Sequence, residues 1–235
     1  MLKFWKRLNR YYDRLLRLLL IPVLLIAAWC IWDNYYVYSR AENDDLLRYK
    51  PGQSDGSGGA DGDSGLDGMV AWLTAEGAGI DAPVMQAEDN LTYLNRDPLG
   101  HYALSGSIFL DCRCSADFSD PYSLIYGHHM ERGKMFGGLD AYLDAGYLAS
   151  HSRGTLMIGT DGGEVHRLEI FAAMRADDKE PAVFDPGTAD VRAYIAQHAD
   201  VFAADSRRSS RILGLSTCAD ESTARIVVFC YILDE

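Results

Sequence analysis

Two apolar, β-branched runs near the end of the chain constrain its fold most. They are Leu213–Cys218 and Arg225–Leu233, separated by the polar and small residues 219–224. This spacing predicts two antiparallel strands joined by a short loop. In the second run both the odd-numbered and the even-numbered positions are apolar, so we expect both faces of this strand to be covered. A thiol, Cys218, would then close one strand beside Arg225, which opens the next.

A cysteine beside an arginine at the rim of a sheet suits nucleophilic catalysis. Strand ends hold side chains firmly, and a guanidinium favours a thiolate or donates to an oxyanion on a substrate carbonyl. The alternative is a buried structural cysteine and a surface arginine, since free cysteine is among the most buried residue types. The proton partner of a nucleophilic cysteine is usually histidine. His128 is the best candidate because it follows a predicted strand and a glycine, whereas His129 points elsewhere if the backbone is extended.

The N-terminal part of the chain is predicted to be a membrane anchor. Residues 1–14 form a basic segment, and residues 15–36 contain an uncharged run from Leu18 to Trp32. Together with the preceding leucines, this run approaches the roughly 20 residues that a spanning helix needs. The positive-inside rule then predicts a single-pass protein with a cytoplasmic N-terminus and an extracellular body. A cleaved signal peptide is the alternative, but Trp29–Asp33 makes a poor small-residue cleavage site.

Residues 37–68 are predicted to be an extracellular linker, and residues 69–235 a folded domain. The stretch 51–68 is rich in Gly, Ser and Asp and has no periodic apolar pattern, which is typical of a flexible tether. Within it, Asp61–Asp67 partly matches a calcium-binding loop but lacks two of the required oxygen ligands. The sequence therefore predicts no calcium site there.

Short apolar segments bounded by turn residues continue through the domain. Besides the two final runs, the predicted strands are 69–73, 82–86, 107–111, 123–127, 155–159 and 166–173. Helical spacing predicts an amphipathic helix over 135–147, and Thr188 is predicted to cap a second helix that extends to about residue 203. Many short strands with two inserted helices favour a mainly β fold, a closed or nearly closed β-barrel.

The composition and the residue spacings argue against two classes of function. The chain carries a formal net charge of -12, which argues against a nucleic-acid partner because phosphate binding needs a basic face. A zinc site built from His128, His129, Cys112 and Cys114 is the main alternative use of these side chains. Their spacings fit no common structural zinc pattern, and adjacent histidines rarely reach one metal. We therefore predict no metal site.

Several motifs together resemble the class B sortases, a family of cysteine transpeptidases. The matching segments are Asp89–Asn90, Tyr93–Leu94, Gly106–Asp111, Ile125–Met130, Gly133–Phe136, Leu215–Cys218 and Arg225–Val228. They occur in the family's order, and the resemblance covers roughly residues 69–235. It implies a mainly β fold, a closed eight-stranded sortase-type β-barrel with an N-terminal helical segment and inserted helices.

The resemblance also implies an activity and the residues that carry it out. Cys218 would be the nucleophile, His128 the general acid/base, and Arg225 the residue that positions the oxyanion and the substrate. The substrate would be a secreted protein with an LPxTG-like or NPxTx-like sorting signal near its C-terminus, cleaved after Thr. The acyl group would pass from the enzyme to an amine of a cell-wall precursor or a pilin. This reaction needs neither a metal nor an organic cofactor.

Other family positions imply a substrate groove. Asn90, Leu94, Tyr126 and Ser216 match residues that line it, and each is equally compatible with a place in the core or in a turn. Asp220, also assigned to the substrate site, either orients a catalytic group or shapes the turn. Two alternatives use the same residues: a non-catalytic, membrane-tethered β-barrel that binds a peptide, and a cysteine hydrolase with water as acceptor.

Overall fold

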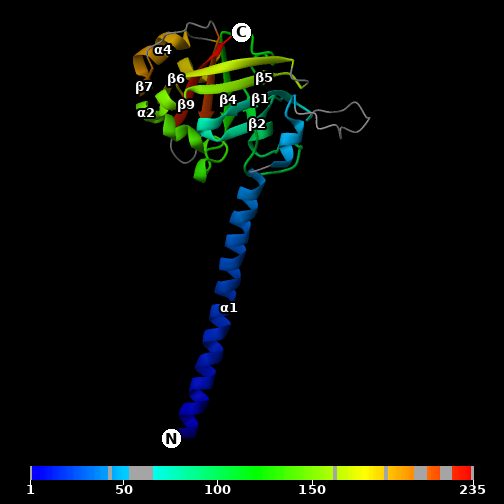
Figure 1. The fold of residues 1–235 in the computed structure, drawn as a ribbon. Helices are drawn as coiled ribbons and strands as arrows, with labels where there is room; N and C mark the ends of the chain where they lie inside the picture. The colour runs from blue at the N-terminus through cyan, green and yellow to red at the C-terminus, as the bar shows by residue number, and fades with distance from the viewer. Residues whose placement is uncertain are drawn as a thin grey trace, which may run out of the picture. The chain divides into compact units, whose positions relative to one another are not determined.

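The computed structural model of the chain divides into two compact units, an N-terminal helix and a folded domain (Figure 1). The structure describes residues 2–41, 44–52, 66–160, 163–187, 190–203, 211–217 and 224–233. Three residues singled out above, Thr188, Cys218 and Asp220, lie outside these ranges.

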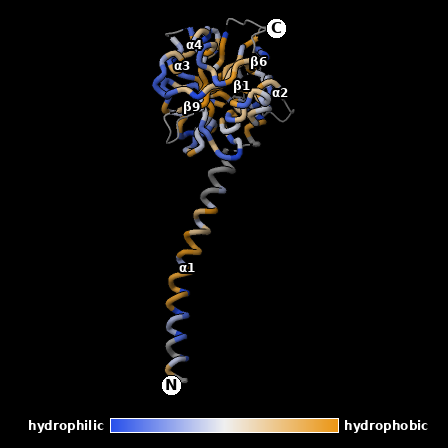
Figure 2. Tube along the Cα trace, turned by 90° about the vertical axis from the view of Figure 1, so that its left-hand side faces the viewer, coloured by the Kyte–Doolittle hydropathy of each residue, from blue (hydrophilic) through white to orange (hydrophobic). Residues whose placement is uncertain are grey.

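The N-terminal unit is the single helix α1, Leu2–Ala41. Its segment Phe4–Trp32 is long and apolar enough to cross a membrane. Figure 2 shows a more hydrophilic N-terminal stretch of α1 followed by a hydrophobic one. A helix satisfies its backbone hydrogen bonds internally, as a lipid environment requires. The predicted anchor, residues 15–36, lies within α1, and this one apolar helix is compatible with membrane anchoring.

The domain is a closed β-barrel of eight strands. The strands are β1 Met69–Ala75, β2 Ile80–Met85, β3 Ile108–Leu110, β4 Tyr122–Gly127, β5 Arg153–Ile158, β6 Glu164–Asp177, β8 Ile212–Thr217 and β9 Ala224–Leu233. Their order is β5-β1-β2-β3-β4-β8-β9-β6, and a further pairing of β6 with β5 closes the ring. The short β7, Val201–Phe202, pairs with β6 outside the ring. The eight-stranded barrel implied by the family resemblance is confirmed.

Both faces of the barrel wall are covered by side chains. Alternate residues of β9 contribute to different cores: Val228 and Cys230 belong to one cluster of buried side chains, and Val227 and Phe229 to another. Hydrophobic segments accordingly gather in the middle of the domain and hydrophilic ones around it (Figure 2). The antiparallel pair of β8 and β9, with β9 covered on both faces, is as predicted.

The amphipathic helix predicted over 135–147 is instead divided into two. A 3-10 helix, η5, covers Gly137–Leu143, and the α-helix α2 covers Ala145–Ser150. Met135 has a left-handed backbone (φ 50°), which no helix accommodates. Asp144 then starts α2 by accepting a hydrogen bond from the backbone N–H of Tyr147 at 2.7 Å. The buried side chains recur every three residues here, a spacing that fits a 3-10 helix as well as an α-helix.

A second insertion, between β6 and β8, carries the helices α3, Pro181–Phe184, and α4, Val191–His198. The cap of α4 is Asp190, whose side chain accepts from the backbone N–H of Ala193. The prediction of Thr188 as the cap is therefore wrong, because α4 begins directly after Asp190 and the N-cap is the residue immediately before the first turn.

Part of the predicted linker belongs to the folded domain. Asp44–Tyr49 forms the 3-10 helix η1, and its Leu46 is buried in the same cluster as Trp72. Lys50 donates to a carboxylate oxygen of Asp81 at 2.7 Å, which ties the residue after η1 to β2. The remaining short helices are η2 Glu76–Ala78, η3 Thr92–Leu94 and η4 Glu131–Gly133.

Candidate active site

Three strand ends meet at one edge of the barrel. β4 and β8 are parallel neighbours, with Gly127 aligned with Thr217, so both strands end at this edge. β9 runs antiparallel to β8 and starts there. His128 is the first residue after β4, and Arg225 is the second residue of β9. The fold thus brings a histidine and an arginine that are far apart in sequence to the strand end at which β8 stops.

The imidazole of His128 is half-buried and oriented by a backbone carbonyl. Its Nε2 lies 2.7 Å from the carbonyl oxygen of Leu94, the last residue of η3. A carbonyl only accepts, so Nε2 must carry a proton and donate it. In the neutral ring, Nδ1 is then the nitrogen that accepts or releases a proton. Of the candidate substrate-site residues, Leu94 therefore contributes through its backbone.

His129 has a different partner. Its Nε2 lies 2.9 Å from Oδ2 of Asp140 in η5, and its backbone bridges to Met135. The two adjacent histidines therefore diverge, as expected where the backbone is extended. His129 is the more exposed of the two.

Arg225 presents unused hydrogen-bonding capacity at the same edge. The side chain is half-buried, and its Cζ lies 5.2 Å from the ring centroid of Phe184 in α3. Its Nε is buried and has no hydrogen-bond partner among the described residues. An unpaired buried donor is costly, and an incoming oxygen acceptor would remove that cost.

Tyr126 and Ser216 are built into the wall beside this edge. They are aligned across the β4–β8 pair, and both are buried. The hydroxyl of Tyr126 donates to Oδ2 of Asp111 at 3.1 Å, and that of Ser216 donates to the Thr217 carbonyl at 3.1 Å. Burial, followed by the nearby carboxylate of Asp111, raises the pKa of Tyr126 well above its ordinary value. Tyr126 is therefore a neutral hydroxyl donor.

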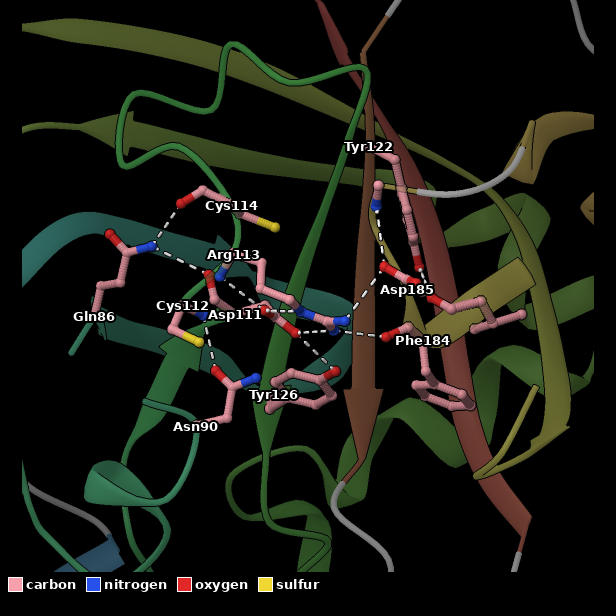
Figure 3. Close-up of polar contacts among 12 residues, drawn as sticks. Gln86, Asn90, Asp111, Cys112, Arg113, Cys114, Tyr122, Tyr126, Phe184 and Asp185 are labelled. Carbon is pink, nitrogen blue, oxygen red and sulfur yellow. Dashed lines mark hydrogen bonds and ion pairs between the residues drawn. The ribbon is translucent and has the colours of Figure 1, made fainter. Parts of the chain in front are cut away.

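An ion pair lies next to the hydroxyl group of Tyr126 (Figure 3). Asp111 is fully buried, and its two oxygens accept from Nε of Arg113 at 2.9 Å and from Nη2 at 2.7 Å. Burial alone would raise the pKa of Asp111, but the hydrogen bonds from Arg113 outweigh it and lower the pKa below its usual value. Sequence reasoning did not single out this pair. Its signal was an Asp and an Arg two residues apart directly after an apolar strand.

Asn90 supports the same loop from the other side. Its Oδ1 accepts from the backbone N–H of Cys112 at 2.8 Å. This amide oxygen therefore already has a partner inside the domain, and the Asn90 side-chain amide also donates a hydrogen bond to Asp111, which helps to lower the pKa of that carboxyl group. The fifth candidate substrate-site residue, Asp220, lies outside the described ranges.

The described cysteines of the domain are free thiols, namely Cys112, Cys114 and Cys230. Burial raises the pKa of Cys114 to about 11, and burial raises the pKa of Cys230 further. These two thiols are therefore protonated and weakly nucleophilic at neutral pH. Within the described ranges, no group of three or more His, Cys, Asp or Glu side chains is placed to hold a metal ion.

Comparison with known proteins gives consistent matches. No protein-family model matches the chain. Sortase B of Listeria monocytogenes is 36% identical over 159 residues, a match that covers 65% of this chain and 63%, less than two thirds, of that protein. A class B sortase of Streptococcus pyogenes involved in pilus biogenesis superposes with a TM-score of 0.64 at 30% identity, over 80% of this chain and 96% of that one. A Staphylococcus aureus sortase B–substrate complex also superposes with a TM-score of 0.64, at 26% identity, over 72% of this chain and 81% of that one.

Proposed function

Because the chain belongs to the class B sortases, we propose that it is a membrane-anchored cysteine transpeptidase. The observation that carries the proposal is the alignment of Gly127 with Thr217 at the shared end of β4 and β8. The residues that follow these two in the chain are His128 and Cys218. Arg225 is the second residue of the neighbouring strand β9, so the three groups needed for acyl transfer come from three adjacent strand ends.

In the first half of the proposed reaction, the Cys218 thiolate attacks the carbonyl carbon of the Thr residue in the substrate. The negative charge that develops on the carbonyl oxygen is stabilised by the guanidinium of Arg225, whose Nε lacks a described partner. His128, as imidazolium, gives its Nδ1 proton to the departing amine. The peptide bond breaks and a thioester forms on Cys218.

In the second half, an amine attacks the thioester carbonyl. The neutral Nδ1 of His128 takes the proton of the attacking amine, Cys218 leaves as a thiolate, and a new amide bond forms. The hydrogen bond from Nε2 to Leu94 keeps the ring in one orientation through both halves. The contacts of His128 and Arg225 thus suit the two roles without a cofactor.

The proposed substrates are secreted proteins with an LPxTG-like or NPxTx-like sorting signal, and the proposed acceptor is an amine of a cell-wall precursor or a pilin. The neighbouring structures support this class of partner, since one is a sortase B–substrate complex and another is a sortase of pilus biogenesis. Asn90, Tyr126, Ser216 and Asp220 are proposed to border the peptide. The basic residues before the apolar part of α1 support a cytoplasmic N-terminus and an extracellular domain.

The test is product analysis with the full chain in detergent micelles. The chain is incubated with peptides of either signal type, with and without an added amine, and the products are identified by mass spectrometry. A transpeptidase joins the Thr carboxyl group to the amine and yields little hydrolysed peptide when amine is present. If the hydrolysed peptide is the only product both with and without amine, the hydrolase is favoured. If the peptide stays intact, the non-catalytic binding protein is favoured.

A further inference from the structure

Two consecutive carbonyls at the end of α3 are held by side chains of the barrel. The Val183 carbonyl accepts from the hydroxyl of Tyr122 at 2.9 Å, and the Phe184 carbonyl accepts from Nη2 of Arg113 at 2.7 Å. The last carbonyls of a helix have no partner within it, so these two bonds satisfy them. Val183 is completely buried. The backbone that carries the Phe184 ring is therefore fixed to the wall of the barrel.

Arg113 is itself held in one place. The bidentate pair with Asp111 restrains its guanidinium, because a planar fork and a carboxylate fit in one geometry. The backbone of the Asp111–Cys114 loop is fixed by Gln86, whose amide donates to the Asp111 carbonyl at 3.1 Å and to the Cys114 carbonyl at 2.7 Å. Figure 3 shows the guanidinium between Asp111 on one side and the Phe184 carbonyl on the other.

The ring of Phe184 meets the guanidinium of Arg225. The distance of 5.2 Å from Cζ to the ring centroid is within the range of a cation–π contact. A ring face restrains the plane of a guanidinium without occupying any of its N–H donors. The Nε–H donor of Arg225, which has no hydrogen-bond partner among the described residues, remains available to a reacting oxygen.

We propose that Phe184 is a positioning residue for Arg225, and that the Asp111–Arg113 ion pair sets the position of Phe184. The inference rests on the proposed catalytic use of Arg225. A series of described contacts then runs from the buried carboxylate, through the guanidinium of Arg113 and the backbone and ring of Phe184, to the group that stabilises the oxyanion. Neither Asp111 nor Arg113 needs to touch the substrate.

The kinetic test uses the full chain in detergent micelles. Phe184→Leu removes the aromatic face, Phe184→Tyr keeps it, and Arg113→Ala removes the anchor. Arg175→Ala is the matched control, since Arg175 forms a surface pair with Asp200 at 3.9 Å. We expect Phe184→Leu and Arg113→Ala to lower kcat by about 2- to 30-fold with little change in KM, and the other two variants to match the wild type. In an Arg225→Ala background the same substitutions should have no further effect, and equal losses in both backgrounds would overturn the proposal.

A second readout does not need activity. The Nε–H resonance of Arg225 is assigned by NMR through its loss in Arg225→Lys, and the ring current of Phe184 should shift it. We expect the resonance to move in Phe184→Leu and Arg113→Ala and to stay in place in Phe184→Tyr, with melting temperatures recorded for each. An unchanged resonance in Phe184→Leu would overturn the inference. A wild type that does not process peptide but shows the ring-dependent shift would instead contradict the proposed function alone.

Discussion

Gly127 of β4 lies directly opposite Thr217 of β8 in the parallel pair. The end of β4, which His128 follows, is therefore in register with the end of β8, which Cys218 follows in the sequence. Gly127 also has a packing role, because a Cβ atom there would come within 2.8 Å of the fully buried ring of Phe136. Phe136 can therefore pack against this end of β4 only because residue 127 has no side chain.

Gly127→Ala should therefore destabilise the domain. The added methyl group has to displace an aromatic ring that has no free space, and overpacking of this kind costs about 1–3 kcal/mol. Urea unfolding of the full chain in micelles, followed by tryptophan fluorescence, measures this loss. Gly187→Ala is the matched control, because its φ, like that of Gly127, is not in the left-handed region and a Cβ there would meet only Oδ1 of Asp185 at an ordinary 3.8 Å. Equal stability of Gly127→Ala and the wild type would show that the end of β4 is not packed as described.

His128→Ala should lower the rate of acyl transfer by about 100- to 10,000-fold, the usual contribution of a general acid/base. His129→Ala is the matched neighbour, and it should remain close to wild-type activity because its imidazole pairs with Asp140 instead. The measurement is kcat/KM for a sorting-signal peptide with an amine. A larger loss of kcat/KM in His129→Ala than in His128→Ala would show that His129, and not His128, is the general acid/base.

The stability of the domain should fall in acid partly through Asp81. Burial raises the pKa of this carboxyl group, but hydrogen bonds from Lys50, Trp72 and Thr74 outweigh it and lower the pKa below 3.8. Asp81 therefore stabilises the fold fully above the unfolded-state pKa, and this stabilisation is lost as the pH falls through the lower folded-state value.

The corresponding experiment compares the free energy of unfolding of Asp81→Asn with that of the wild type at pH 7 and at about pH 3, which is just below the usual pKa of an unfolded-state aspartate. We expect the variant to be less stable at pH 7, and the difference to shrink in acid. Asp200→Asn, which removes an exposed partner of Arg175, is the control and should change neither value much. A difference that grows as the pH falls would contradict the sign of the shift.

The sequence predicts the barrel well because its signals are local. β9 is apolar at both parities, and this pattern alone indicates a strand that is covered on both faces. The segment 135–147 shows where such reasoning fails. Its apolar spacing fits both a 3-10 and an α-helix, and the breaks in the helix come from the left-handed backbone of Met135 and the extended backbone of Asp144, which the spacing does not report.

The site is predictable in part for a similar reason. His128 and Arg225 each adjoin a clear strand signal, so the sequence and the family resemblance both single them out. The ion pair of Asp111 with Arg113 does not stand out, because its role depends on Phe184, which lies 71 residues further along the chain. Such a contact is set by tertiary packing, and no local pattern reports it.

The most direct measurement of the central claim is the identification of the acyl-enzyme. The full chain is incubated with a sorting-signal peptide in the absence of amine, and the intact protein and its proteolytic fragments are analysed by mass spectrometry. We expect a thioester on Cys218 that is absent in Cys218→Ala, persists in Cys112→Ala, and disappears on addition of an amine. An adduct on another cysteine, or peptide turnover by Cys218→Ala, would contradict it.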